Sequence, residues 1–268
     1  MKKIFSVLFF LFAHALHALP VGNPAEIKLA PCTSECPSFL SCSVGFYGDY
    51  VFNRHLQTVR GKVIDTTKLF TNAGYVAVNF FDRWTIFSTL GVTNLSLNTS
   101  LGAFNAIDPH PLFEIETESA FSYSIGGRGA LFCYKKFWFG LSGRYFSTEP
   151  NVKRFYIASG AVSYPGDAVR THYSEWQVAG GVSYRYNEYF IPYAAVKYAH
   201  AFWKLNNGNL FIIEDNTNTH LFNMKNHKHW GYAIGLTLCP LCSDVLAVIA
   251  EARFGDEKAF HINVLTLF

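Results

Sequence analysis

The sequence Phe260-His261-Ile262-Asn263-Val264-Leu265-Thr266-Leu267-Phe268 ends the chain and alternates in character with a period of two. Counting back by twos from Phe268 gives mostly apolar residues, and the other register holds the polar His261 and Asn263. Such alternation is typical of a β-strand with one apolar face. An aromatic last residue predicts a closed barrel in an outer membrane, whose final strand pairs with its first, with Phe268 as the barrel-assembly signal.

The opening residues have the parts of a secretory signal in order. Lys2 and Lys3 precede an apolar run over residues 4–13, and Leu16-His17-Ala18 is a cleavage motif, so the mature chain is expected to begin at Leu19. The sequence predicts a signal peptide (1–18), a cysteine-bearing N-terminal segment (19–40) and an outer-membrane β-barrel (41–268). The expected location is the bacterial cell outer membrane.

The composition favours a protein with an apolar surface. Half of the residues are apolar, 17% are aromatic and 15% are charged, whereas soluble domains have about 25% charged residues. The surplus apolar surface predicts outer-membrane lipid as a partner. The net charge is +3 and long Lys/Arg runs are missing from the sequence, so no nucleic-acid partner is expected.

Period-two alternation recurs along the chain and predicts an all-β fold, a transmembrane antiparallel β-barrel of about 12 strands, with 10 to 16 open. In residues 230–238, Trp230 and Ile234 share one face, and Gly231 and Gly235 share the other, where small residues suit a crowded lumen. The clearer candidates besides the tail are residues 44–52, 71–81, 84–92, 121–131, 137–146, 175–186, 190–198, 230–238 and 245–254, with weaker ones at 155–164, 100–107 and 209–213.

Short and long links between these strands predict tight periplasmic turns and long external loops. Short links lie at residues 81–83, 134–136, 187–188 and 255–258, and long polar ones at 54–68, 108–118 and 204–228. The alternation of short and long fails between residues 95 and 172, so at least one element predicted there is missing or false.

Charged residues on the inner register are the candidate pore lining. Five are basic and three acidic, which suggests a slight anion preference, since lumen charge sets selectivity. An alternative is that these groups pair with one another and plug a small barrel. They are Asp49, Arg128, Arg144, Glu175, Arg185, Lys197, Glu251 and Arg253.

Six cysteines in an exported chain are disulfide candidates: Cys32, Cys36, Cys42, Cys133, Cys239 and Cys242. The Cys239-Pro240-Leu241-Cys242 spacing also occurs in redox and zinc sites, but its place between two predicted strands favours a periplasmic turn with disulfide-capable thiols. His227 and His229 are interpreted as loop histidines rather than metal ligands.

No nucleophile elbow, phosphate loop or zinc-protease motif occurs, so neither an enzyme nor a cofactor or metal is expected.

Ordered blocks along the whole chain resemble the chlamydial major outer membrane protein family. The mature start Leu19-Pro20-Val21-Gly22-Asn23-Pro24-Ala25-Glu26 and the strand Val44-Gly45-Phe46-Tyr47-Gly48-Asp49-Tyr50-Val51-Phe52 are similar to that family's opening and first strand. Further similar blocks are Asp82-Arg83-Trp84, Tyr173-Ser174-Glu175-Trp176-Gln177, Glu251-Ala252-Arg253 and His261-Ile262-Asn263. The chain departs from the family in its shorter length, reduced loops and fewer cysteines.

The resemblance implies a porin that admits small hydrophilic solutes through the outer membrane and helps to stiffen the envelope through disulfides. Expected partners are a second copy of the chain and disulfide-linked envelope proteins. Two alternatives stay open: a non-conducting structural barrel cross-linked through its cysteines, and a secreted soluble β-sandwich acting as a binding module.

Overall fold

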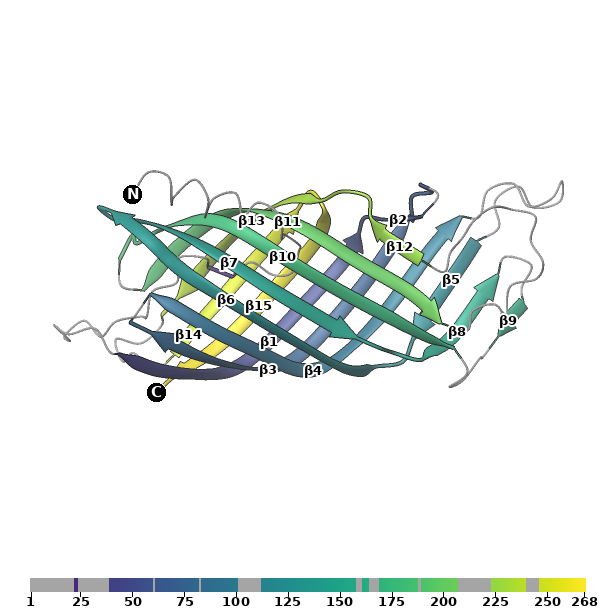
Figure 1. The fold of residues 1–268 in the computed structure, drawn as a ribbon, viewed down its shortest axis with the longest axis horizontal. Coiled ribbons are helices and arrows are strands. Elements are labelled where there is room, and N and C mark those ends of the chain that lie inside the picture. Colours follow the sequence, from purple (N-terminus) through teal and green to yellow (C-terminus); the bar gives the residue numbers. More distant parts are fainter. Residues whose placement is uncertain are drawn as a thin grey trace, which may run out of the picture.

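The computed structural model describes residues 22–23, 39–59, 61–81, 83–100, 112–157, 161–163, 169–187, 189–206, 223–239 and 246–268. Ten antiparallel strands form a closed barrel, in the spatial order β3-β1-β15-β14-β13-β11-β10-β7-β6-β4 and back to β3 (Figure 1). They are β1 (Leu40–Arg54), β3 (Thr66–Phe80), β4 (Trp84–Ser100), β6 (Ala120–Tyr134), β7 (Phe137–Thr148), β10 (Arg170–Tyr184), β11 (Phe190–Asn206), β13 (Trp230–Leu238), β14 (Leu246–Phe254) and β15 (Glu257–Leu267).

The all-β barrel is confirmed, and its ring of ten strands lies within the predicted range. Five shorter strands join the same sheet: β2 (Leu56–Thr58), β5 (Leu112–Thr117), β8 (Val152–Ile157), β9 (Ala161–Ser163) and β12 (Asn223–Asn226). Strand β5 pairs with β4, β8 with β5, and β12 with β11 and β2. All of these pairings lie at one end of the barrel (Figure 1).

These short strands explain why the alternation of links fails between residues 95 and 172. β5, β8 and β9 lie within the two long connections there and extend the sheet beyond the ring, so the weak strand predicted at 155–164 does not cross the barrel. With the ring as observed, the strand ends that border the β3–β4, β6–β7, β10–β11 and β13–β14 connections share one end of the barrel. The strand ends that border the long connections share the other, together with the tight turn between β14 and β15. We take the end with the long connections as external. Of the weak candidates at 100–107 and 209–213, Ser100 is the last residue of β4 and the rest lie outside the described residues.

The barrel closes between its first and last strands, as the tail pattern predicted. β1 pairs with β15 from Ser43 opposite Leu267 to Arg54 opposite Glu257. The backbones of Cys42 and Phe268 exchange two further hydrogen bonds, of 2.9 and 3.2 Å. A closed ladder leaves no barrel strand with an unpaired edge in lipid.

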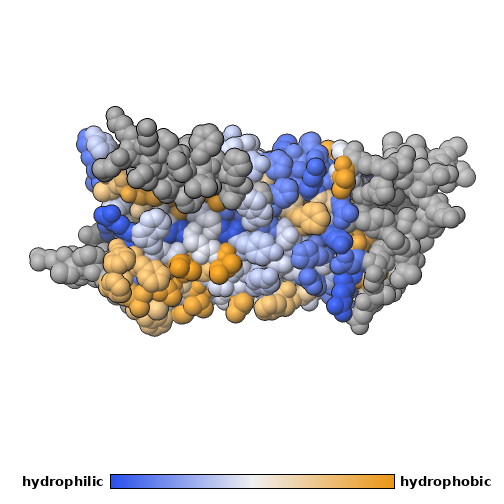
Figure 2. All heavy atoms as spheres, in the orientation of Figure 1, coloured by the Kyte–Doolittle hydropathy of each residue, from blue (hydrophilic) through white to orange (hydrophobic). Residues whose placement is uncertain are grey.

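The two faces of the wall differ as lipid on the outside requires. Outward side chains in the middle of the strands include Val76, Ile86, Leu90, Ile125 and Ile234, all more than half exposed. Inward positions between them are Thr, Ser, Ala, Gly, Tyr and charged residues, nearly all buried. In Figure 2 apolar residues gather along the lower edge of the visible face, and hydrophilic ones form a band near the end that carries β5 and β8. No helix among the described residues is long and apolar enough to cross a membrane.

Aromatic side chains ring both ends of this apolar wall, as strand-end aromatics of an outer-membrane barrel do. The periplasmic rim carries Trp84, Phe132, Tyr134, Tyr186 and Phe268, each at least half exposed. Toward the external end the exposed aromatics are Phe52, Phe121, Trp230, Tyr232, Phe254 and Phe260.

Phe268 gives a prediction that separates folding from assembly. Its ring is 76% exposed and only its backbone pairs with β1, so Phe268→Ser should change the free energy of unfolding of the refolded barrel by less than about 0.5 kcal/mol. If the ring is the assembly signal, the same variant should reach the outer membrane of expressing cells at a severalfold lower level. Tyr186→Ser, which removes another exposed ring at the same rim, is the control. Equal membrane levels of the two variants would contradict the assignment.

Candidate functional site in the barrel interior

Seven of the eight residues predicted to line the pore project from the inner register of the wall. Seven are buried: Asp49 on β1, Arg128 on β6, Arg144 on β7, Glu175 on β10, Lys197 on β11, and Glu251 and Arg253 on β14. Arg185, the eighth, is partly exposed in the turn after β10 at the periplasmic rim. The structure therefore gathers most of the predicted set in the interior and leaves Arg185 apart.

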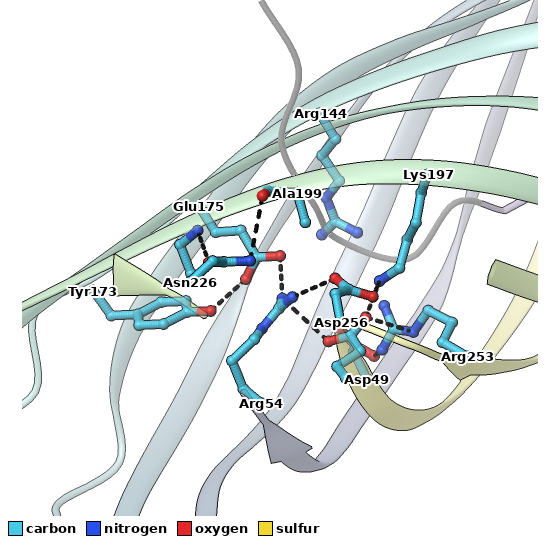
Figure 3. A network of polar contacts seen from close by, with 12 residues as sticks. Asp49, Arg54, Arg144, Tyr173, Glu175, Lys197, Ala199, Asn226, Arg253 and Asp256 are labelled. Atoms are coloured by element: carbon cyan, nitrogen blue, oxygen red, sulfur yellow. Dashed lines mark hydrogen bonds and ion pairs between the residues drawn. The ribbon is translucent and has the colours of Figure 1, made fainter. Parts of the chain in front are cut away.

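The centre of the interior is an ionic cluster around Arg54, the last residue of β1 (Figure 3). Its Nη1 lies 2.8 Å from Oδ2 of Asp256 and its Nη2 lies 3.1 Å from Oε2 of Glu257. The same Nη2 pairs with Glu175, whose other oxygen accepts a hydrogen bond from the Tyr173 hydroxyl. All of these groups are buried, so each charge depends on its neighbours rather than on water.

Two more cations complete the cluster. Nζ of Lys197 lies 3.1 Å from Oδ1 of Asp256 and also pairs with Glu257. Nε of Arg253 lies 3.2 Å from Oε1 of Glu257, while its guanidinium donates to Asp49. We call Asp49, Arg54, Glu175, Lys197, Arg253, Asp256 and Glu257 the interior ionic cluster. It joins β1, β10, β11, β14 and β15, which line half of the ring.

The turn between β14 and β15 brings two of the carboxylates inside. Gly255 has φ of +99°, a left-handed conformation that glycine adopts without strain, and it reverses the chain sharply enough to place Asp256 over the lumen. Gly231 on β13 leaves the space for that carboxylate, because a Cβ at Gly231 would collide with Asp256 and Lys197. The predicted turn at 255–258 was too long, since Glu257 and Lys258 already belong to β15, and it lies at the external end of the barrel rather than at the periplasmic end, where short links were expected.

Arg144 and Arg128 lie toward the periplasmic side and contact neutral groups. Arg144 donates to the Tyr47 hydroxyl and, at 3.1 Å, to Oγ1 of Thr89, and its guanidinium stacks 4.4 Å from the centre of the Tyr47 ring. Arg128 donates to the Tyr75 hydroxyl at 2.9 Å. Rings and hydroxyls thus hold these two cations against the wall.

Part of the N-terminal segment lies inside the barrel. The Asn23 side chain is buried, accepts a 2.7 Å hydrogen bond from Ser183 on β10, and lies 3.5 Å from Oγ1 of Thr237 on β13. A Cβ at the adjacent Gly22, whose φ is +60°, would come 3.0 Å from the guanidinium of Arg128 on β6. Gly22 and Asn23 therefore lie between β6 and β13, two strands that are four positions apart around the ring.

The external end of the interior is apolar. Wall residues such as Leu69, Leu97 and Trp203 pack there with Phe113 of β5 and Met224 of β12, all almost fully buried. The short strands thus supply a hydrophobic core that covers the interior ionic cluster from outside.

Sequence reasoning missed Arg54, Asp256 and Glu257 for two different reasons. Counting by twos from Asp49 gives Asn53 as inward, but a β-bulge between Val51 and Asn53 shifts the register and turns Arg54 inward. Asp256 and Glu257 were missed because they were assigned to the predicted turn at 255–258 and not to a strand. Glu257 lies four residues after Arg253 and so shares its inward register, and this acidic pair beside the predicted strand was the signal that could have identified them.

The cysteines and histidines singled out in the sequence lie apart. Cys42 and Cys133 are exposed near the periplasmic rim, Cys42 on the outward register of β1 and Cys133, opposite Trp138 of β7, on the inward register of β6, and Cys239 is buried; Cys32, Cys36 and Cys242 lie outside the described residues. Nδ1 of His227 contacts the Gln57 side chain and Nδ1 of His229 contacts the Ala199 carbonyl, each at 2.9 Å. Within the described ranges no group of three His, Cys, Asp or Glu residues is arranged to hold a metal.

The closed ring, the apolar wall with aromatic rims and the ionisable interior define an outer-membrane β-barrel protein. A family model described as Chlamydia major outer membrane protein matches residues 57–110. The major outer membrane porin of Chlamydia muridarum is 27% identical over 403 aligned positions, covering 98% of this chain and 99% of the porin. That of Chlamydia psittaci is 28% identical over 391 positions, with the same coverage.

The chain is similar to the chlamydial major outer membrane porins over nearly its full length, which confirms the resemblance seen in the sequence. The alignments run over more positions than the 268 residues of the chain because the relatives carry insertions. Among solved structures, the outer membrane protease OmpT from Escherichia coli is 10% identical with a TM-score of 0.42, covering 89% of this chain and 99% of that one.

Proposed function

We propose that this outer-membrane barrel is a porin with a narrow lumen, through which small hydrophilic solutes and ions cross passively. The observation that carries the proposal is the set of ionisable side chains on the inner register, enclosed by an apolar outer wall. A barrel of ten strands lies between those of about 8 strands, which side chains fill, and those of about 16, which leave an aqueous channel. The relatives are named porins, and the proposal includes no enzymatic activity.

The charge balance suggests weak ion selectivity. Among the described residues, the buried interior holds five basic residues (Arg54, Arg128, Arg144, Lys197 and Arg253) and five acidic ones (Asp49, Glu175, Glu251, Asp256 and Glu257). Of the eight predicted residues, the partly exposed Arg185 is the one that adds a positive charge at the rim. The anion preference expected from the predicted eight residues is thereby reduced.

Conductance in a planar lipid bilayer tests the proposal. The refolded protein should give small discrete current steps, and Asp256→Asn with Glu257→Gln should enlarge them and shift the reversal potential toward anion selectivity, because two negative charges leave the lumen. Glu116→Gln, at an exposed carboxylate on β5, is the matched control and should conduct like the native chain. Absence of steps from correctly folded native protein at every voltage and salt concentration would overturn the proposal.

A non-conducting structural barrel is the second candidate. The apolar core at the external end and the mutual pairing of the interior ionic cluster favour it, since both fill the lumen. The exposed Cys42 and Cys133 at the periplasmic side would then link the barrel to other envelope proteins by disulfides. Multimers that disappear on a gel run with reductant support this role, and an unchanged monomer in both gels excludes it.

A further inference from the structure

The outer wall of the barrel is hollowed where β1, β3 and β4 adjoin. Two neighbouring hollows of about 360 and 350 Å³ share Asn72 and Val92 in their linings. Small residues, among them Gly74 and Gly91, form the part nearer mid-barrel, beside the larger Phe46 and Leu90. We call this continuous depression the β3 groove. It lies on the outward register, so it faces the membrane rather than the lumen.

A polar side chain lies in this apolar setting. Asn72 is exposed on the outward register of β3, between outward neighbours Gly48 on β1 and Val92 on β4. Its Oδ1 accepts a 2.9 Å hydrogen bond from the Tyr50 hydroxyl. No described residue accepts a hydrogen bond from its amide nitrogen. An amide donor facing hydrocarbon is costly unless something in the membrane accepts from it.

The external end of the groove carries the features of a headgroup site. The rings of Tyr50, Phe52 and Phe70 cluster there, with centroids 6.2 and 5.9 Å from Phe70, at the level where aromatic side chains meet lipid headgroups. Beyond them, Lys68 on β3 and Lys258 on β15 are exposed on the same face. Lys258 lies opposite Asn53 of β1, so about two strand spacings, or roughly 10 Å, separate the two lysines.

We propose that the β3 groove binds one phosphate-bearing lipid of the outer leaflet. An acyl chain lies along the small residues from Asn72 to Gly74, the Asn72 amide donates to an ester carbonyl, and the two lysines contact the phosphate. Charge favours this occupant because Lys68 and Lys258 form no ion pair with a described carboxylate, and long lysine side chains reach from the wall to headgroups. A second copy of the chain would have to supply both an acceptor for Asn72 and two anions.

The test is lipid retention by the purified barrel, measured by native mass spectrometry after exchange into detergent containing phosphatidylglycerol. Gly74→Phe fills the groove, and it does so without strain in the wall, because a Cβ at Gly74 meets only the Leu90 carbonyl at 3.8 Å. Gly127→Phe is the matched control, since Gly127 lies on the outward register of β6, away from the groove, and its Cβ would be 3.5 Å from the Thr85 carbonyl.

We expect the native chain and Gly127→Phe to retain one phosphatidylglycerol and Gly74→Phe to lose it. Lys68→Ala and Lys258→Ala should each weaken retention about fivefold for phosphatidylglycerol, with no effect on retention of diacylglycerol, which lacks the phosphate. Equal retention by Gly74→Phe and Gly127→Phe would overturn the proposal. So would a dimer of the native chain that Gly74→Phe abolishes while leaving lipid retention unchanged, since the groove would then bind a second copy.

Discussion

Replacing Arg54 with alanine is expected to lower the free energy of unfolding by about 3 to 5 kcal/mol, because it leaves buried carboxylates without their shared cation. Glu175, Asp256 and Glu257 all pair with this one guanidinium, and all are buried. Urea unfolding of the refolded barrel in detergent, followed by tryptophan fluorescence, measures the change. The lost electrostatic pairing outweighs the loss of packing because none of the three carboxylates can turn to water.

Arg154→Ala is the matched control for this prediction. Arg154 on β8 also pairs with two carboxylates, Glu116 at 3.1 Å and Glu114 at 3.8 Å, but its side chain is 42% exposed. Exposed ion pairs contribute about 0 to 1 kcal/mol, so this variant should unfold almost like the native chain. Equal destabilisation by the two alanine substitutions would show that burial does not increase the contribution of the interior ionic cluster to the free energy of unfolding.

A rescue variant separates charge from packing. If unpaired carboxylates cause the loss, adding Asp256→Asn and Glu257→Gln to Arg54→Ala should recover part of the stability, since less uncompensated charge remains buried. If the triple variant loses as much free energy of unfolding as Arg54→Ala and the double carboxylate variant lose together, the effect of Arg54→Ala comes from the missing side-chain volume of Arg54.

The second large effect is expected on the other face of the wall. Ile234 is 56% exposed at the middle of β13, with Ala194 and Ala252 as its ladder partners, so its side chain faces lipid at mid-membrane depth. Ile234→Arg should destabilise the barrel reconstituted in liposomes by about 2 to 4 kcal/mol, because a charge at the midplane is costly to hold in hydrocarbon. Reversible unfolding from liposomes provides the measurement.

Val59→Arg distinguishes a lipid effect from a general effect of arginine. Val59 is 60% exposed in the turn after β2, outside the ring of barrel strands. There the new guanidinium stays in water, so the change in stability should be within about 0.5 kcal/mol. If Ile234→Arg is equally harmless, the outward register of β13 does not touch lipid.

Alternation predicted most of the wall because lipid and a polar lumen impose opposite demands on successive residues. Residues 230–238 were predicted as a strand and form β13 with those same bounds, with Ile234 outward and Gly231 inward. The pattern is strongest where both faces are constrained. It fades at the external end, where β3, β4 and β11 extend beyond the predicted ranges and their inner faces meet the apolar core.

The interior site was less predictable because pairing depends on register and on turns. A single bulge after Val51 turns Arg54 inward. The alternation of apolar and polar residues in the sequence does not reveal where a residue has been inserted into a strand. Which carboxylate meets which cation depends on strands distant in sequence, as with Arg54 and Asp256. The inner register identified Glu175 and Lys197 but not their partners.

The seam between β1 and β15 couples membrane insertion to closure of the ring. Its ladder joins the first strand of the wall to β15, from Ser43 with Leu267 onward. While this seam is open, β1 and β15 each have one unpaired edge, and the bare amides and carbonyls of such an edge are costly in hydrocarbon. The ring must therefore close before, or together with, its transfer into the bilayer.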